Sequence, residues 1–215
     1  MPTGEDEFVI YVHGYLEDLA GGGENQAKAL QVALRKQGYR QPVVAALWDS
    51  NTLNWWKAKD AAERAGRELA GWIDDYLAGY PDTTVRVVGH SLGGRAAYAM
   101  LSALESDLAS VSTLGAASDP DAVCRDGKWG SAIAGFDGPV YNFHSTRDGI
   151  VCRDYALLEF TPAVGCVGAA CDGLFTASSP PGNYRDVDVS TQVDHHCDYY
   201  RAEVGCVPQL VERFE

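Results

Sequence analysis

The stretch VRVVGHSLGGRAAYAML, residues 85–101, decides the fold because its pattern changes abruptly. Its valines favour a buried strand over residues 85–89, and the Ala-rich part that follows is typical of a helix from Leu92 to about Leu104. Ser91 stands at the joint, with Gly89 and Gly93 two residues away on either side, and glycines allow a turn too tight for side chains. Ser91 is therefore either a reactive hydroxyl on a strained turn or an ordinary helix N-cap.

The remaining chain alternates between strand and helix patterns. Further strands are expected at residues 8–13, 43–48, 110–115, 139–144 and 187–189, and further helices at residues 24–37, 55–77 and 208–214. This alternation predicts an α/β fold with a mostly parallel sheet and helices on both faces. We expect residues 1–215 to form one domain, with reactive groups at the carboxyl ends of the strands.

A serine hydroxyl becomes a nucleophile only when a base removes its proton and an acid orients that base. On a strand-turn-helix elbow of this kind, the acid follows the serine in the chain and the histidine comes last. Of the five histidines, only His195 and His196 lie beyond every expected strand. His196 is preferred because His196-Cys197-Asp198-Tyr199 resembles the H-S-x-Y pattern around the base of small lipases and esterases, and His195 is the alternative base.

The acid is expected on a loop at the carboxyl end of a later strand. Asp148 has this position after the strand of residues 139–144, and Asp119 and Asp121 hold a similar one after the strand before it. An oxyanion needs backbone donors, and one should be the N–H of Leu92, directly after the serine. Tyr15, which follows the His-Gly pair at the end of the first strand, is the second candidate donor.

Taken together, VHGY at 12–15, GHSLGG at 89–94, the Asp148 loop and HCDY at 196–199 resemble the α/β-hydrolase superfamily, in particular its small lipase-like and esterase-like members. The resemblance implies one domain with about six strands, a Ser91–His196–Asp148 triad, an acyl-enzyme intermediate, and no metal or organic cofactor. The chain begins almost at the His-Gly strand, so the first two strands of larger members are expected to be missing. The cap is expected to be minimal.

Two features near the expected site stay open at this stage. The Gly-, Pro-, Ser- and Cys-rich stretch of residues 154–185 forms either a loose lid or a surface segment. The aromatic residues Tyr15, Trp48, Trp55 and Trp56 form either an apolar rim around a cleft or part of the core.

The charge restricts the partners. Thirty acidic residues face 17 basic ones, for a net charge of −13, which opposes binding to nucleic acids and to anionic membranes. The same excess suits either an ordinary acidic protein or a halophilic, haloarchaeal-type surface, on which salt screens the self-repulsion. No apolar run approaches the ~18 residues of a membrane span, and no signal peptide is visible. For the location of the protein, two alternatives fit: the cytoplasm of a halophile, or secretion with a signal peptide that is missing from this sequence.

Six cysteines occupy the second half of the chain and form no C-x-x-C pair. Two or three disulfides and six reduced, buried thiols both fit the pattern. Cys166 with Cys171 and Cys197 with Cys206 are the short-range pairings. The full set is Cys124, Cys152, Cys166, Cys171, Cys197 and Cys206.

The sequence favours a serine carboxylester hydrolase that cleaves neutral acyl esters such as lipids or polyesters. An acidic surface should not attract anionic acyl carriers, so a thioesterase is less favoured, and an amidase on the same fold is the other enzymatic alternative. A scaffold that keeps the turn without catalysis is the alternative from a different class.

Overall fold

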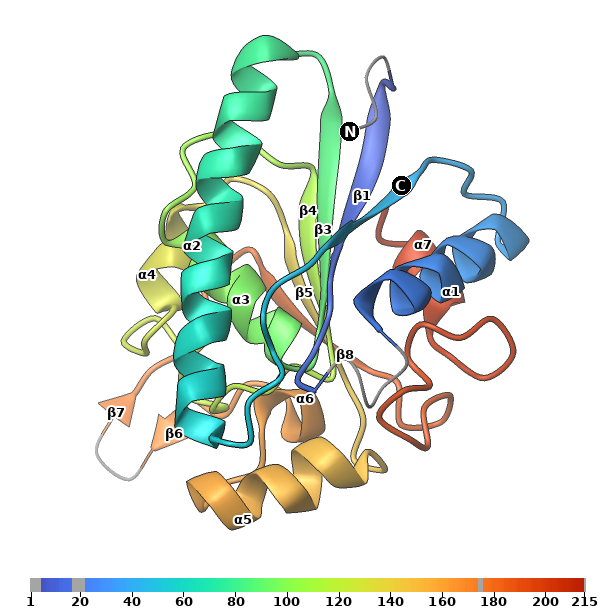
Figure 1. The fold of residues 1–215 in the computed structure, drawn as a ribbon. Helices are drawn as coiled ribbons and strands as arrows, with labels where there is room; N and C mark the ends of the chain where they lie inside the picture. Colours follow the sequence, from blue (N-terminus) through green and yellow to red (C-terminus); the bar gives the residue numbers. More distant parts are fainter. Residues whose placement is uncertain (1–4, 17–21, 174–175, 215) are drawn as a thin grey trace.

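Six parallel strands, all within the described residues, form the central sheet of this computed structural model (Figure 1). The structure describes residues 5–16, 22–173 and 176–214. The strands lie in the order β2-β1-β3-β4-β5-β8. Their bounds are β1 Glu7–Val12, β2 Val43–Ala46, β3 Thr84–His90, β4 Ser110–Leu114, β5 Val140–His144 and β8 Tyr184–Asp188.

Helices cover both faces of the sheet, as the alternating pattern predicted (Figure 1). Strand β1 shows why: Phe8, Ile10 and Val12 pack on the side of α2 and α3, whereas Val9 and Tyr11 pack on the side of α1 and α7. This period of two is that of a strand buried on both faces. The bounds of these helices are α1 Gly23–Lys36, α2 Trp55–Gly79, α3 Leu92–Leu101 and α7 Val207–Val211.

The predicted strand at residues 187–189 is wrong in its position, since β8 runs from Tyr184 to Asp188. It pairs with β5 alone, and as an edge strand it carries three exposed charged residues, Arg185, Asp186 and Asp188. The other expected strands and helices are present, with ends that differ by a few residues.

The stretch of residues 154–185 contains structure that the sequence pattern did not predict. A π-helical turn, Ile150–Asp154, leads into α5 Tyr155–Glu159, and α6 Val164–Val167 follows. The two-stranded sheet of β6 Asp172–Gly173 and β7 Thr176–Ala177 comes next, and α4 Gly130–Gly135 lies earlier in the chain. In α6, Val164, Gly165 and Cys166 are buried, so this part of the stretch packs into the body of the protein.

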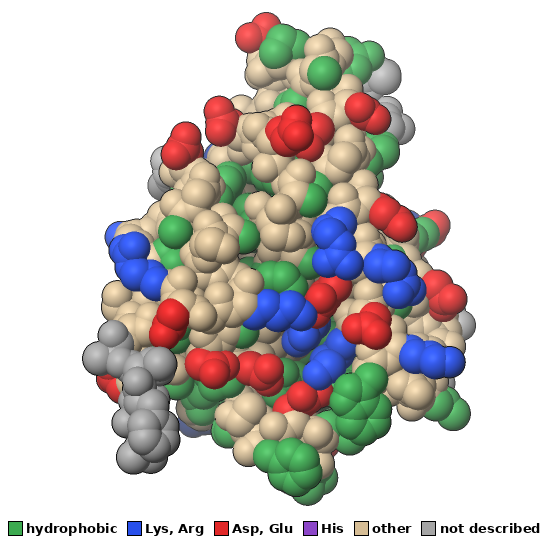
Figure 2. Space-filling view, turned by 90° about the vertical axis from the view of Figure 1, so that its left-hand side faces the viewer, with side chains coloured by type: hydrophobic (Ala, Val, Ile, Leu, Met, Phe, Trp, Pro, Cys, Tyr) green, Lys and Arg blue, Asp and Glu red, His purple; other side chains and the backbone are tan. Residues whose placement is uncertain are grey.

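Acidic side chains are not spread evenly over the surface. Figure 2 faces the side on which α2 and α4 lie, and basic side chains gather in its middle with acidic ones around them. Within the described residues, Arg95 of α3 and Lys128 both contact the carboxylate of Glu63 on α2. Burial alone would raise the pKa of Glu63, but the two cations lower it overall. No helix in the described part of the chain has the length and apolar content of a membrane span.

Candidate active site

Ser91 lies in a strained turn between β3 and α3, with φ 57° and ψ −122°. A non-glycine residue with positive φ of this kind costs about 1–3 kcal/mol, so the surrounding structure must hold it. The flanking glycines explain how: a Cβ on Gly89 would lie 2.3 Å from the Gly93 carbonyl oxygen, and one on Gly93 would lie 2.1 Å from the oxygen of Val12. The Ser91 side chain makes no capping hydrogen bond, so the N-cap interpretation has no support.

His196 and Asp148 are in direct contact at the carboxyl end of β5. His196 Nδ1 lies 2.7 Å from Asp148 Oδ2, and the Asp148 side chain is fully buried. Asp148 Oδ1 accepts a hydrogen bond from the Ile150 N–H at 3.0 Å, which fixes the carboxylate. A carboxylate that accepts from Nδ1–H leaves Nε2 as the basic nitrogen of the ring.

The turn with Ser91 lies beside this pair. The Ser91 N–H donates to the Leu114 carbonyl at 3.0 Å, and a Cβ on the next residue, Gly115, would lie 3.1 Å from Asp148 Oδ2. Between Ser91 Oγ and the His196 ring, both among the described residues, the structure has no hydrogen bond. Such contacts in serine hydrolases often close only when substrate binds.

His90 links the serine turn to the histidine loop, a role that the sequence analysis did not assign. Its Nε2 lies 2.8 Å from the His196 carbonyl oxygen, and the two ring centroids are 4.6 Å apart. Burial, and next the adjacent His196, lower the pKa of His90 to about 3. His90 is therefore neutral at ordinary pH and donates Nε2–H to that carbonyl. The signal in the sequence was the histidine directly before Ser91 in Gly-His-Ser-Leu-Gly.

Of the two expected oxyanion donors, Leu92 follows Ser91 in the chain, whereas Tyr15 belongs to the loop that packs against it. The Leu92 N–H is the first of α3, and the first four N–H groups of a helix have no partner within it. Gly14 packs against the serine so closely that a Cβ there would lie 2.8 Å from Ser91 Cβ, and Tyr15 is the next residue. A pair of donors from these two segments stays a proposal.

The alternative acids and the alternative base lie in other surroundings. Asp119 accepts a hydrogen bond from the Tyr155 hydroxyl at 2.7 Å, and Asp121 is exposed. His195 is exposed, and its backbone N–H donates to Asp198. In the parts of the chain that the structure describes, no group of three or more His, Cys, Asp or Glu side chains could hold a metal ion.

The aromatic residues near the strand ends divide between packing and exposure. Trp48 stacks on His13 with 5.4 Å between ring centroids and donates Nε1–H to the His13 carbonyl. Trp55 packs edge-on against Tyr15, while Trp56 is exposed. The core interpretation therefore holds for Tyr15, Trp48 and Trp55, and an apolar rim around a cleft stays a prediction.

Both short-range cysteine pairings are wrong. The disulfides join Cys124 to Cys171 and Cys152 to Cys166, across 47 and 14 residues of sequence. Cys197 and Cys206 are free thiols, and burial raises the pKa of Cys206 to about 12. Both disulfides fasten the segment that follows the Asp148 loop.

The order of the strands, with helices on both faces and the tight turn after β3, is that of the α/β-hydrolase fold. Solved structures with this fold match almost the whole chain. No protein-family model matches the chain, and no curated protein sequence matches it.

A lipase-esterase related protein from Clostridium acetobutylicum is 11% identical, with a TM-score of 0.58, and the match covers 99% of this chain and 96% of that one. Esterase PE8 is 19% identical, with a TM-score of 0.57 and coverage of 96% and 92%. The monoacylglycerol lipase of Paleococcus ferrophilus is 13% identical, with a TM-score of 0.51 and coverage of 96% and 93%. These likenesses show that the fold is shared.

Proposed function

We propose that the protein is a serine carboxylester hydrolase that uses Ser91, His196 and Asp148. The observation that carries the proposal is the 2.7 Å contact between His196 Nδ1 and the fully buried Asp148 carboxylate, beside a serine held at φ 57°. A buried carboxylate that orients an imidazole next to a strained serine is the arrangement that nucleophilic acyl transfer requires.

In the proposed reaction, Ser91 Oγ attacks the ester carbonyl carbon while His196 Nε2 takes the hydroxyl proton. The oxyanion accepts hydrogen bonds from the N–H groups of Leu92 and Tyr15. The imidazolium then gives its proton to the leaving alkoxide, which departs as the alcohol and leaves an acyl-serine. Water repeats the sequence, with His196 as base again, and releases the carboxylic acid.

His90 supports this cycle without contact to the substrate. His196 must gain and lose a proton in each half-reaction, and a second positive charge 4.6 Å away would oppose that gain. Because the pKa of His90 is lowered to about 3, its ring stays neutral while His196 cycles. His90 is thus a positioning residue that fixes the His196 backbone.

Neutral acyl esters are the substrate class that the charge favours. A net charge of −13 repels anionic acyl carriers, which argues against a coenzyme-bound thioester. The similarity to a protein named a monoacylglycerol lipase also favours a neutral ester as the substrate. An amidase and a thioesterase use the same three residues, so a substrate panel of esters, thioesters and amides with matched acyl groups would separate them.

Kinetics of three variants test the proposal. Ser91→Ala and His196→Ala should each lower kcat/KM for p-nitrophenyl butyrate by a factor of about 10³ or more. His195→Ala is the matched control, because it removes the neighbouring exposed ring, and it should change kcat/KM by less than about threefold. Thermal melting shows that each variant is folded. A folded Ser91→Ala variant with substantial turnover would disprove the assignment, and a folded wild type without turnover on the panel would favour a scaffold.

A further inference from the structure

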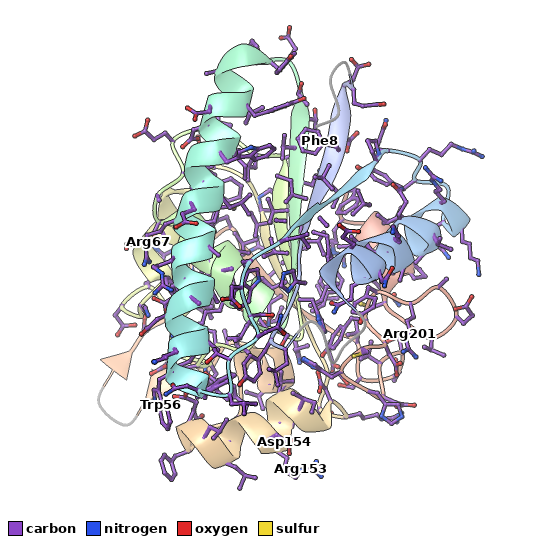
Figure 3. All side chains as sticks on the ribbon, viewed as in Figure 1. Phe8, Trp56, Arg67, Arg153, Asp154 and Arg201 are labelled. Carbon is purple, nitrogen blue, oxygen red and sulfur yellow. A yellow bond between two sulfur atoms is a disulfide. The ribbon has the colours of Figure 1, made fainter. Side chains whose placement is uncertain are left out.

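Large apolar side chains project into solvent from one end of the molecule. Leu53 is 91% exposed, Leu157 is 73% exposed and Phe160 is 95% exposed. We call the set the apolar platform, and it consists of Leu53, Trp56, Ile150, Leu157, Leu158 and Phe160. Figure 3 shows Trp56 at the beginning of α2, at the end of the molecule where α5 lies, and large hydrophobic side chains protrude from this lower end in Figure 2.

Two segments far apart in the sequence form the platform, and buried polar contacts hold them together. The Glu159 carboxylate of α5 accepts hydrogen bonds from Trp55 Nε1 and Lys59 Nζ of α2. Burial alone would raise the pKa of Glu159, but these two donors outweigh it, so the pKa lies below its usual value. The rings of Trp55 and Tyr155 also meet edge-on at 5.7 Å. These contacts hold α5 beside the beginning of α2, so the platform residues of the two segments lie at the same end of the molecule.

The platform is fixed to the body of the protein. The Cys152–Cys166 disulfide joins the π-helical turn to buried α6, and the Tyr155 hydroxyl donates to Asp119 at 2.7 Å. With Glu159 bound to α2 at the other end of α5, the helix is held on three sides. A surface fastened in this way is exposed at all times and does not open as a lid.

The platform is continuous with the candidate active site. Ile150 is one of its members, and the Ile150 N–H donates to Asp148 Oδ1. Only one residue separates Ile150 from the Asp148 carboxylate that contacts His196. Through Ile150, the platform therefore reaches the loop that carries Asp148.

The shape and charge of the platform select its partner. Its most exposed side chains project from a loop and a short helix and do not line a groove, and a fluid interface adapts to such a surface without needing a complementary shape. Beside Ile150, Arg153 and Asp154 form an ion pair with each other. The net charge of −13 opposes anionic lipid headgroups.

We propose that the apolar platform docks the protein on a lipid–water interface without net charge, which delivers acyl esters from that interface to Ser91. The delivery of esters rests on the proposed function, whereas docking does not. Because the platform is permanently exposed, a dissolved ester should be hydrolysed without any interface.

Flotation with phosphatidylcholine vesicles tests docking separately from catalysis. The protein carrying Ser91→Ala should float with the vesicles, and the added pair Leu157→Ser and Phe160→Ser should lower its partition coefficient about tenfold or more. The matched control adds Val32→Ser and Tyr80→Ser, two exposed apolar residues outside the platform, and should float like the parent. Vesicles containing an anionic phospholipid should bind the parent less.

Four results would overturn the proposal: no flotation of the parent, equal loss in the platform and control pairs, preference for anionic vesicles, or a dimer in sedimentation that the platform pair dissolves. In the presence of wild-type Ser91, the platform pair should retain kcat/KM for dissolved p-nitrophenyl butyrate and lose activity on emulsified esters. Flotation without any ester hydrolysis would remove the proposed function and leave docking intact. Hydrolysis of dissolved esters without flotation would remove the docking proposal and leave the proposed function intact.

Discussion

Gly14 touches the serine turn so closely that one added methyl group should disturb the candidate nucleophile. In Gly14→Ala, the new Cβ would lie 2.8 Å from Ser91 Cβ and 3.3 Å from Ser91 Oγ. Carbon atoms in ordinary contact are about 3.5–4.0 Å apart, so the serine and the His-Gly loop must separate by roughly 0.7 Å or more. A misplacement of about 1 Å at a reacting group costs on the order of 100-fold in rate.

We therefore expect Gly14→Ala to lower kcat/KM for p-nitrophenyl butyrate by about 10- to 100-fold. The protein should stay folded, because overpacking of this kind costs about 1–3 kcal/mol against a typical stability of 5–15 kcal/mol. Gly71→Ala on α2 is the matched control: no atom lies within 4 Å of its new Cβ. It should keep full activity and gain up to about 1 kcal/mol from helix propensity.

The assay is steady-state hydrolysis with a thermal melt of each variant. Full activity in a folded Gly14→Ala protein would refute the reasoning, because the reacting group could then not be the serine against which Gly14 packs. A loss of activity in Gly71→Ala of the same size would refute it as well, since the effect would not depend on proximity to Ser91.

Three further predictions concern the supports of the site. Replacement of Cys124 and Cys171 by Ser opens a 47-residue loop, which should lower the free energy of unfolding by about 4 kcal/mol. Calorimetry should then show a Tm lower by about 10 °C, and an unchanged Tm would contradict the disulfide. Iodoacetamide at pH 8 should alkylate Cys197 and spare Cys206, whose buried thiol has a pKa of about 12; mass spectrometry that finds both modified in native protein would contradict this. The lowered pKa of Glu159 gives stability that is complete above its unfolded pKa of ~4.5 and lost as pH falls through the lower folded value. Glu159→Gln should thus lower Tm at pH 7, and the Tm of the variant should fall less than that of the wild type between about pH 5 and 3. Parallel curves of Tm against pH for the two proteins would contradict the role of the Glu159 carboxylate in holding α5 to α2.

Much of the fold could be predicted because β1 and β3 are buried on both faces and carry the apolar runs FVIYV and VRVV. The edge strand β8 was misplaced because Arg185 and Asp186 are exposed, and the apolar pattern is confined to its flanks. The adaptation to high salt stays a prediction, because net charge reports on solubility and association and not on the fold.

The disulfides could not be predicted from spacing, because pairing depends on which loops the sheet brings together. The nearest partner in sequence was wrong for both Cys166 and Cys171. The candidate site was more accessible to prediction, since the turn around Ser91 demands glycines that the sequence displays. The apolar platform was not predicted: short α5 has too few residues for a periodic pattern, and its place beside α2 depends on the tertiary contacts of Tyr155 and Glu159.

Covalent labelling with a fluorophosphonate tests the central claim most directly, because the reagent phosphonylates an activated serine hydroxyl. Peptide mass spectrometry of the native protein should find the adduct on Ser91 alone, and His196→Ala should suppress it. An adduct on another residue, or none in folded protein, would contradict the claim that the turn between β3 and α3 holds an activated nucleophile.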